Sequence, residues 1–505
     1  MSSESENDGG LLKASSASDD DDDVVNLRST SESEPEPIYH KLKKKRNHPK
    51  NKELVCSMLT LPEHLAAYME ERELDRDIKP LECSEDTVEK IFNNYVIIKN
   101  ILGHLSWQEK LISKDVCLLW NSAINRLQNE QLGPVDFSIK IHVERYMNKV
   151  QYKLLKSSEF YTEPMAIFTF CNMVSMGAMY SILCEDTVPP PCSPVCDQLH
   201  CILDIIYQET TAPRDCMYIV KAHTVSYLPL PQSITMENAI RKPKIHSDAF
   251  FCGIYIPKIP GVEFRMLSSS NSTQEELITE IKSLTEQYIV KGVVACLTDN
   301  YLLYVDHFVI IFCRQPGIPF AFGGCLVEDT VNNAQDLANI VHCMNNQQDF
   351  ISGNVMSLGL FLTLKDSSPK SSTAAEEPKQ NFEIYSFVMK STVWNKSSIQ
   401  QAVQEFSEQI PRFEHSVALK FSCTGRHHKH EMEQQSFRTF FPNTRLAGCF
   451  GNGELGVNHL KSTTHLPTAT KRVREIIPYD KVHSYSTIFF YIGWGRIIEE
   501  AERDD

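Results

Sequence analysis

The hydrophobic pattern of this chain changes its period near residue 130, and this change constrains the fold more than any other feature. Before it, apolar residues recur at the spacing of one helix face, whereas after it they form short continuous or alternating runs of strand length. With 505 residues, 42% of them apolar, the chain can bury a sizeable core and form two or three domains. The sequence therefore predicts an α+β protein, in which a small all-helical domain precedes a larger mixed α/β region.

The helical pattern spans residues 84–130. One predicted helix carries a single apolar stripe that consists of Ile97, Ile98, Ile101, Leu102 and Leu105. Ser106 and Glu109 then have the spacing of a capping box, so a second helix is expected directly after the first. The apolar face of this second helix consists of Val116, Leu119, Trp120, Ala123 and Leu127. Because such short helices bury little surface by themselves, we expect them to bind a partner helix.

Seven apolar or alternating runs after residue 130 are expected to form strands, at 165–174, 251–256, 292–297, 308–313, 357–364, 416–423 and 486–493. Helices are expected at about 331–344 and after two capping boxes, Thr273 with Glu276 and Ser398 with Gln401. Segments 316–329 and 442–454 resemble one another, each with a proline before an apolar run and a Gly-rich turn. Two interpretations of this similarity stay open: two copies of one module, or chance.

Residues 1–55 are rich in charged residues, Ser and Pro, so we expect a disordered tail. Residues 1–40 carry a net charge of −9, residues 41–52 carry seven positive charges, and the remainder carries −13. The acidic body argues against direct nucleic-acid binding. The basic run is either a solvated linker or a nuclear-import signal. Sixteen cysteines without regular spacing, no signal peptide and no long apolar run predict a reduced intracellular protein without a membrane segment.

Three glycines, Gly451, Gly453 and Gly456, have the G-x-G-x-x-G spacing of phosphate-binding turns. A dinucleotide-binding turn needs an apolar-striped helix and a further strand after it, and the following residues show neither pattern. We therefore expect no nucleotide and no other cofactor. The glycines are expected to provide positive φ in tight turns, with Asn452 and Glu454 at the edge of a loop.

Other candidate chemistry is weak. One group lacks the usual spacing of zinc ligands; it consists of Cys192, Cys196, His200 and Cys201. A second group is interpreted as exposed residues at the start of a helix; it consists of His427, His428 and His430. We therefore predict no metal site. Cys423 precedes Arg426, which could lower the pKa of the thiol, but a core thiol at a strand end is the favoured interpretation. Because no catalytic constellation stands out, we predict a protein that is not an enzyme.

Residues 95–127 resemble an F-box. The family pattern is an apolar helix ending in I-L-x-x-L and a later V-C-x-x-W, which this chain matches with Ile101, Leu102, Leu105, Val116, Cys117 and Trp120. The chain departs from the family at the missing Leu-Pro start, at Ser106 where proline is usual, and at Lys110, which occupies a commonly apolar position.

The C-terminal region from 380 to 497 resembles a FIST C-terminal domain. The likeness is carried by FSCTGR at 421–426, FRTFFPNTRLAGCFGNGELG at 437–456 and VHSYSTIFFYIGWG at 482–495, in the family's order. Val457 replaces the proline of the family's G-E-[IL]-G-P turn. The resemblance implies that residues 131–370 form the preceding FIST-like α/β region.

Together these resemblances imply a non-catalytic substrate-recognition subunit of an SCF-type ubiquitin ligase, in the cytoplasm and nucleus. Its expected partners are the Skp adaptor, through it the cullin and RING subunits, and protein substrates marked for proteasomal degradation. The implied adaptor-binding residues are Ile97, Ile98, Ile101, Leu102, Leu105, Leu111, Val116, Leu119 and Trp120. The implied substrate or ligand loop contains Cys423, Arg426, Asn452, Glu454 and His483. The alternative is a ligand-sensing FIST module that acts as a signalling adaptor without assembling a ligase.

Overall fold

The chain divides into two compact units, residues 1–61 and residues 62–505, and the described part lies in the second. The computed structural model describes residues 84–144, 149–172, 182–183, 187–188, 199–200, 209–210, 212–222, 224–230, 249–268, 273–313, 320–327, 329–331, 356–365, 381–458 and 482–498. The predictions of a disordered tail at 1–55, a basic run at 41–52 and a helix at 331–344 lie outside these residues. So do Cys192, Cys196 and Cys201.

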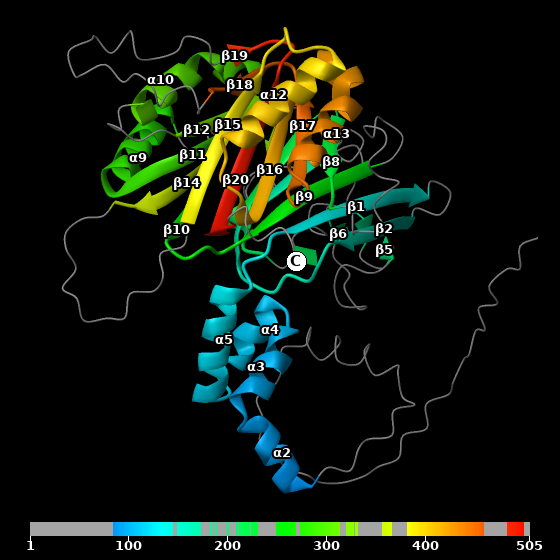
Figure 1. Cartoon of the computed structure of the whole chain (residues 1–505), viewed down its shortest axis with the longest axis vertical. Coiled ribbons are helices and arrows are strands. Elements are labelled where there is room, and N and C mark those ends of the chain that lie inside the picture. Colours follow the sequence, from blue (N-terminus) through cyan, green and yellow to red (C-terminus); the bar gives the residue numbers. More distant parts are fainter. Residues whose placement is uncertain are drawn as a thin grey trace, which may run out of the picture. The chain divides into compact units, whose positions relative to one another are not determined.

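Short helices make up the first described segment (Figure 1). They are α2 (Glu85–Phe92), α3 (Tyr95–Gly103), α4 (Trp107–Ser113) and α5 (Leu118–Glu130). The predicted capping box is present, because the Ser106 side chain accepts from the Glu109 N–H and the Glu109 carboxylate accepts from the Ser106 N–H. A small core fills the space between α3 and α5 and consists of Ile98, Leu102, Ala123, Ile124 and Leu127.

The rest of the described chain is mixed α/β and mostly sheet. A seven-stranded sheet has the order β13 (Asp329–Val331), β7 (Met217–Ala222), β3 (Pro164–Asn172), β9 (Ala249–Pro257), β1 (Val135–Glu144), β2 (Lys149–Lys156) and β5 (Thr187–Val188). A six-stranded sheet has the order β10 (Val262–Ser268), β14 (Met356–Leu364), β11 (Tyr288–Leu297), β12 (Ala321–Leu326), β18 (Glu454–Gly456) and β19 (Val482–His483). A five-stranded sheet has the order β15 (Asn381–Met389), β20 (Thr487–Ile497), β16 (Phe413–Cys423), β17 (Arg445–Gly451) and β8 (Thr224–Leu228). A small separate pair joins β4 (Ile182–Leu183) to β6 (Leu199–His200).

One four-strand arrangement occurs three times in these sheets. The strand orders β1-β9-β3-β7, β10-β14-β11-β12 and β15-β20-β16-β17 each contain two antiparallel pairings followed by one parallel pairing. In the second copy α9 (Gln274–Gln287) and α10 (Leu302–Cys313) connect the same strands that α12 (Lys396–Glu408) and α13 (His430–Phe440) connect in the third. The predicted similarity of 316–329 and 442–454 falls on β12 and β17, which are equivalent strands. The structure therefore contains three copies of the module, where the sequence predicted at most two.

The three copies are linked because each gives its next strand to another copy's sheet. β8 follows β7 but pairs with β17, β13 follows β12 but pairs with β7, and β18 follows β17 but pairs with β12. These exchanges close a ring of three sheets. Strands of the regions predicted at 131–370 and 380–497 consequently share sheets.

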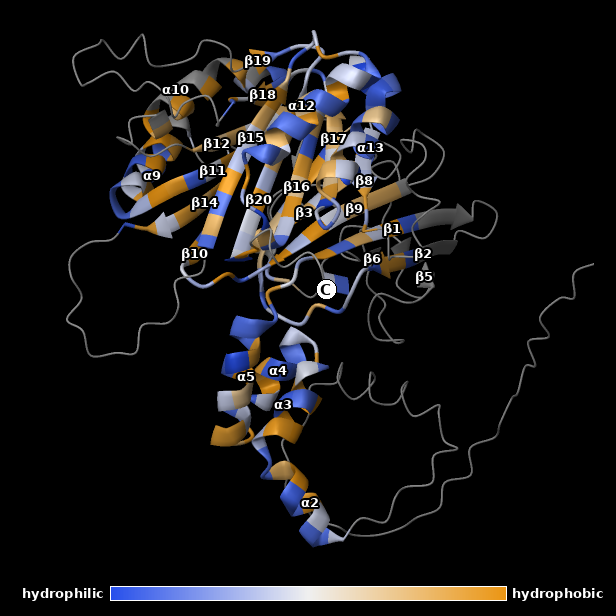
Figure 2. Ribbon diagram, viewed as in Figure 1, coloured by the Kyte–Doolittle hydropathy of each residue, from blue (hydrophilic) through white to orange (hydrophobic). Residues whose placement is uncertain are grey.

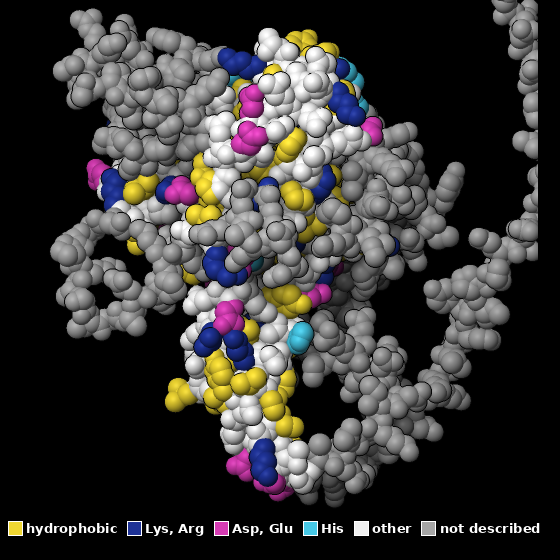
Figure 3. Space-filling model, viewed as in Figure 1, with side chains coloured by type: hydrophobic (Ala, Val, Ile, Leu, Met, Phe, Trp, Pro, Cys, Tyr) yellow, Lys and Arg dark blue, Asp and Glu magenta, His cyan; other side chains and the backbone are white. Residues whose placement is uncertain are grey.

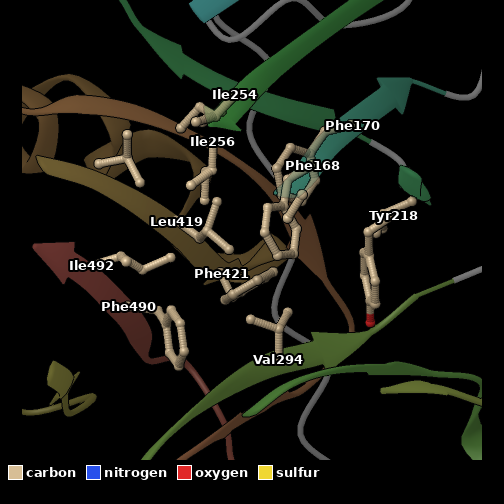
Figure 4. Packing of buried hydrophobic residues seen from close by; sticks show 14 of the residues in the cluster. Phe168, Phe170, Tyr218, Ile254, Ile256, Val294, Leu419, Phe421, Phe490 and Ile492 are labelled. Carbon is tan, nitrogen blue, oxygen red and sulfur yellow. The ribbon is translucent and has the colours of Figure 1, made fainter. Parts of the chain in front are cut away.

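The inner faces of the three sheets meet in one large apolar core. Phe168 and Phe170 of β3, Val294 of β11, and Leu419 and Phe421 of β16 all point into it (Figure 4). The outer faces of the second and third sheets carry separate apolar clusters with α9 and α10, and with α12 and α13. The hydropathy colouring shows apolar residues along the strands, whereas α9, α12 and α13 carry both apolar and polar residues (Figure 2).

Two glycines allow the paired strands of the second and third copies to approach closely. A Cβ on Gly324 would lie 1.8 Å from the carbonyl oxygen of Ala295, and one on Gly448 would lie 1.8 Å from that of Lys420. Each glycine therefore stands at the same place in the parallel pair of its copy. This shared requirement is an independent sign of the repeat.

Six of the seven predicted strands are confirmed, as β3, β9, β11, β14, β16 and β20. The strand predicted at 308–313 is wrong, since these residues end α10. The run is apolar on every side of the helix, so its sequence contains no helical period. The cap at Thr273 is confirmed, whereas α12 begins at Lys396 and its N-cap is Asn395, which accepts from the N–H of Ser398.

Candidate functional site

The helical segment exposes many large apolar side chains. We call these residues the apolar helix surface; it consists of Val96, Ile97, Ile101, Leu111, Ile112, Val116 and Leu118. Leu118 is 89% exposed and Val116 is 61% exposed. The space-filling view shows apolar side chains gathered on this segment between charged ones (Figure 3). Since the segment already has its own core, these side chains are available to a partner.

The apolar residues predicted to form a single stripe on the first helix lie on two different faces, one buried and one exposed. Ile98 and Leu102 are buried against α5, whereas Ile97 and Ile101 are exposed. Leu105, Leu119 and Trp120 pack partly buried against the same small core. Ile98 and Leu102 therefore cannot contact an adaptor while the segment is folded, which corrects their predicted role. The exposed pair can.

Lys110 is buried, 1% exposed, in the position where the F-box pattern is commonly apolar. Its ammonium group donates to the Gln131 side chain and, at 2.8 Å, to the carbonyl oxygen of Tyr161, and it lies 5.1 Å from the centre of the Tyr161 ring. Burial lowers the pKa of Lys110 to about 8. The backbone N–H of Trp107 also donates to the carbonyl oxygen of Phe160 at 2.9 Å. Lys110 thus connects α4 to Gln131, which follows α5, and to Tyr161, which lies between β2 and β3.

The residues predicted as a substrate or ligand loop come together at one end of the third copy. We call Cys423, Arg426, Asn452, Glu454 and His483 the edge cluster. Cys423 ends β16, Asn452 lies between β17 and β18, and Glu454 pairs with His483 across β18 and β19. A hydrogen bond of 2.9 Å from the Thr424 hydroxyl to the carbonyl oxygen of Gly451 joins the first two segments. Proximity is therefore established, while a binding role stays a prediction.

Glu454 is fully buried rather than presented at a loop edge, which corrects the prediction. Its Oε2 accepts from the N–H of Ser486 at 3.0 Å and from the hydroxyl of Ser486 at 2.8 Å. Its Oε1 has no hydrogen-bond partner among the described residues. Burial raises the pKa of the Glu454 carboxyl to about 7. The cluster thus contains a carboxyl group that changes charge near neutral pH and interacts with the Cys423 thiol.

Arg426 is also buried, and its guanidinium group binds other buried groups. Its Nε and Nη2 donate to Oε1 of Glu433 at 2.9 and 2.7 Å, and Lys420 pairs with Oε2 of the same carboxylate at 2.8 Å. Its Nη1 donates to the carbonyl oxygen of Tyr485, a residue with positive φ. The idea that Arg426 activates Cys423 is therefore wrong. Burial, followed by the charge of Glu454, raises the pKa of the Cys423 thiol.

The glycines of the G-x-G-x-x-G motif serve close packing, not turns. Positive φ at described glycines occurs at Gly261 and Gly495, so the predicted positive φ at 451, 453 and 456 is wrong. A Cβ on Gly451 would lie 2.4 Å from the carbonyl oxygen of Leu326 in the neighbouring sheet. The motif therefore marks the contact between two copies of the module.

The histidines predicted at an exposed helix start do lie where α13 begins, but His430 is buried. Burial lowers the pKa of His430 to about 2, so this imidazole is neutral. Within the described ranges, no group of three or more His, Cys, Asp or Glu side chains could hold a metal ion. Nor is any described helix long and apolar enough to cross a membrane.

Comparison with known proteins gives partial matches. No family model matches the chain. The chain is 32% identical over 87 residues to F-box only protein 22 of Pongo abelii and 33% identical over 85 residues to that of Homo sapiens. Each match covers 16% of this chain and about a fifth of the relative, 21% and 20%. The chain therefore shares a distant, partial similarity with F-box proteins.

Among solved structures, a cyanuric acid hydrolase from A. caulinodans is similar with a TM-score of 0.24 and 8% identity, over 66% of this chain and 91% of that chain. A score this low carries no argument about fold or activity.

Sequence reasoning missed part of the helix surface. Val96, Ile112 and Leu118 lie off the predicted stripes, so periodicity assigned them no role. The signal that could have found them is the number of large apolar residues, which exceeds what two faces of such short helices can bury.

Proposed function

We propose that residues 84–130 are an F-box and that the protein is a substrate-recognition subunit of an SCF-type ubiquitin ligase. The observation that carries this proposal is the apolar helix surface on a segment whose own core is complete. An amphipathic surface of this kind suits helix-to-helix docking on a Skp-type adaptor. The partial similarity to F-box only protein 22 supports the same assignment.

The energetics of docking are favourable on this surface. Burying one large aliphatic side chain contributes roughly 1.5 to 3 kcal/mol, and several side chains of the apolar helix surface can be buried together. Leu118 and Val116 are the most effective candidates, because they are among the most exposed. The adaptor contact is therefore expected to depend on them more than on the buried Ile98 and Leu102.

In this proposal the mixed α/β region, FIST-like over 131–370 and 380–497, holds the substrate. The protein performs no chemistry and needs no cofactor; it raises the effective concentration of substrate lysines near the ubiquitin-conjugating enzyme that the cullin and RING subunits bring. Ubiquitinated substrates then pass to the proteasome. The basic run at 41–52 would support a distribution between cytoplasm and nucleus, and deleting residues 41–46 should lower the nuclear share if it is an import signal.

The test is capture of purified Skp-type adaptor by the full chain and by two matched double variants. Val116→Asp with Leu118→Asp places two charges on the apolar helix surface and should weaken capture at least thirtyfold. The control, Ser122→Asp with Asn125→Asp, adds the same charges at exposed polar positions of α5 and should leave capture within threefold. Circular dichroism checks that both remain helical. Equal capture by wild type and both variants would reject the F-box assignment.

A second candidate function is small-ligand sensing at the edge cluster. The observation that favours it is the buried carboxyl of Glu454, which lies beside the Cys423 thiol and could accept from an amine or amide group. A thermal-shift screen of amino acids and related metabolites tests this idea. A ligand that stabilises the wild type but not a Glu454→Gln variant would support it, and no stabilisation by any compound would count against it.

A further inference from the structure

The outer edge of the first strand is covered by another strand in one copy of the module but not, among the described strands, in the other two copies. β1, β10 and β15 are the equivalent outer strands of the three copies. The outer edge of β1 is covered by β2, which pairs antiparallel with it over eight residues, from Phe137 opposite Lys156 to Glu144 opposite Lys149. Among the described strands, β10 and β15 each end their sheet. An edge strand directs every second N–H and C=O away from the sheet, where an extended chain can pair with them.

A cavity of about 580 Å³ adjoins the start of β10. Val262 and Glu263 of β10, Tyr288 at the start of β11 and Leu364 at the end of β14 contribute to its walls. So do residues of the helical segment, which are Leu111, Lys114, Gln128 and Asn129. The side chain of Leu364 is 61% exposed although it is apolar. The volume lies in the range that holds a side chain or a small ligand. The edge of β10 therefore has a pocket beside it.

Charge distinguishes β10 from the equivalent edge at β15. The helix on the β10 sheet, α9, carries four glutamates, at 275, 276, 280 and 286, against Lys282. Its counterpart α12 carries two glutamates against Lys396. Leu267 of β10 belongs to the same apolar cluster as Leu277 and Ile281 of α9, so the acidic helix packs beside this strand. The α9 side of the β10 edge is therefore acidic and favours a basic partner, whereas the cavity itself carries Lys114 and Lys258 beside Glu163 and Glu263.

We propose that the outer edge of β10, which no other described strand covers, binds an extended, basic peptide segment of a partner protein as an added antiparallel strand. The peptide repeats on β10 what β2 does on β1. Its backbone pairs with β10, one of its apolar side chains enters the cavity beside Leu364 and Tyr288, and its cationic side chains face the glutamates of α9. Within the proposed function this would be the contact with substrate. It uses β10 and α9, and it shares with the apolar helix surface only Leu111, which also lines the cavity.

Fluorescence anisotropy with the full chain tests the proposal. The probe is a labelled ten-residue peptide of alternating lysine and valine. Leu364→Asp and Glu280→Lys, both at exposed positions, should each weaken binding about tenfold. Glu405→Lys on the exposed face of α12 is the matched control and should change binding less than twofold. A peptide methylated on alternate backbone nitrogens keeps its charge but cannot pair with β10, and should bind at least tenfold more weakly.

Two results would overturn the inference. One is equal binding of the methylated and unmethylated peptides, because strand addition requires the peptide N–H groups. The other is an equal loss with Glu280→Lys and Glu405→Lys, which would show general attraction to an acidic protein. Failure here is separable from failure of the ligase proposal: Glu280→Lys, which lies outside the cavity that Leu111 lines, should still capture the Skp-type adaptor, and the Val116 and Leu118 double variant should still bind the peptide.

Discussion

Replacing Glu454 by glutamine is expected to change how the stability of the sheet region depends on pH. The carboxyl group is fully buried, and its pKa is raised from 4.5 to about 7 by burial. A group whose pKa is higher in the folded state favours folding while it is protonated. This contribution is fully present below pH 4.5 and is lost as the pH rises through 7. Glutamine does not titrate, so the variant lacks this loss.

The expected size follows from the pKa difference. A shift from 4.5 to about 7 corresponds to about 3 kcal/mol of unfolding free energy between pH 4.5 and pH 8. The amide oxygen of glutamine can still accept both hydrogen bonds from Ser486, so the variant should be more stable than the wild type at pH 8 by up to that amount. At pH 4.5 the two proteins should differ little. Other titrating groups, His430 among them, are present in both proteins and cancel in the difference.

The assay is urea denaturation of wild type and variant at half-unit steps from pH 4.5 to 8, compared as a difference at each pH. Glu405→Gln, at an exposed position on α12, is the control and should give a flat difference. A flat difference for Glu454→Gln as well would refute the argument, because it would mean that the carboxyl titrates alike in the folded and unfolded chain.

Three further predictions follow from packing. Leu102→Ala should lower the unfolding free energy of the helical segment by about 2 to 5 kcal/mol and Ile101→Ala by less than about 1 kcal/mol, as measured by thermal denaturation, since only Leu102 is buried. Gly448→Ala should destabilise by about 3 kcal/mol or more, because its Cβ would lie 1.8 Å from a carbonyl oxygen, whereas Gly133→Ala has nothing within 4 Å and should shift the denaturation midpoint little. Glu433→Gln should cost about 3 to 5 kcal/mol in the same assay by leaving two buried cations without their counter-charge; an unchanged midpoint would contradict the ion-pair account.

The sequence predicted the elements whose signals are local. Capping boxes at Ser106 and Thr273 need only four residues, and six strands stood out because both of their faces are largely buried. The triplication was hidden because each copy gives a strand to another copy's sheet, which no local pattern records. In the edge cluster, proximity was predicted from a resemblance, but burial of Arg426 and Glu454 depends on contacts with α13 and with the segment before β20. Charged residues such as Arg426 and Glu454 are usually expected to be exposed, but here tertiary contacts bury both side chains.

Comparison of two equivalent junctions in the repeat shows whether the fold requires a carboxyl group at position 454. Glu454 stands opposite Cys325 where β18 meets β12, and Val225 stands opposite Cys449 where β8 meets β17. Gly324 and Gly448, each one residue earlier, fix the equivalence of the two cysteines. Val225 is buried, so the fold accepts an apolar side chain at this position.

A buried carboxyl is therefore not an architectural need at this junction, although it lowers stability above pH 7. Glu454→Val should keep the three linked sheets, with its native-state circular dichroism unchanged, but it should be less stable than Glu454→Gln because valine cannot accept the two hydrogen bonds from Ser486. If the variant instead fails to fold, the two junctions are not equivalent and Ser486 needs its carboxylate partner. If it folds and loses binding of a metabolite or substrate that the wild type retains, the carboxyl is present for recognition.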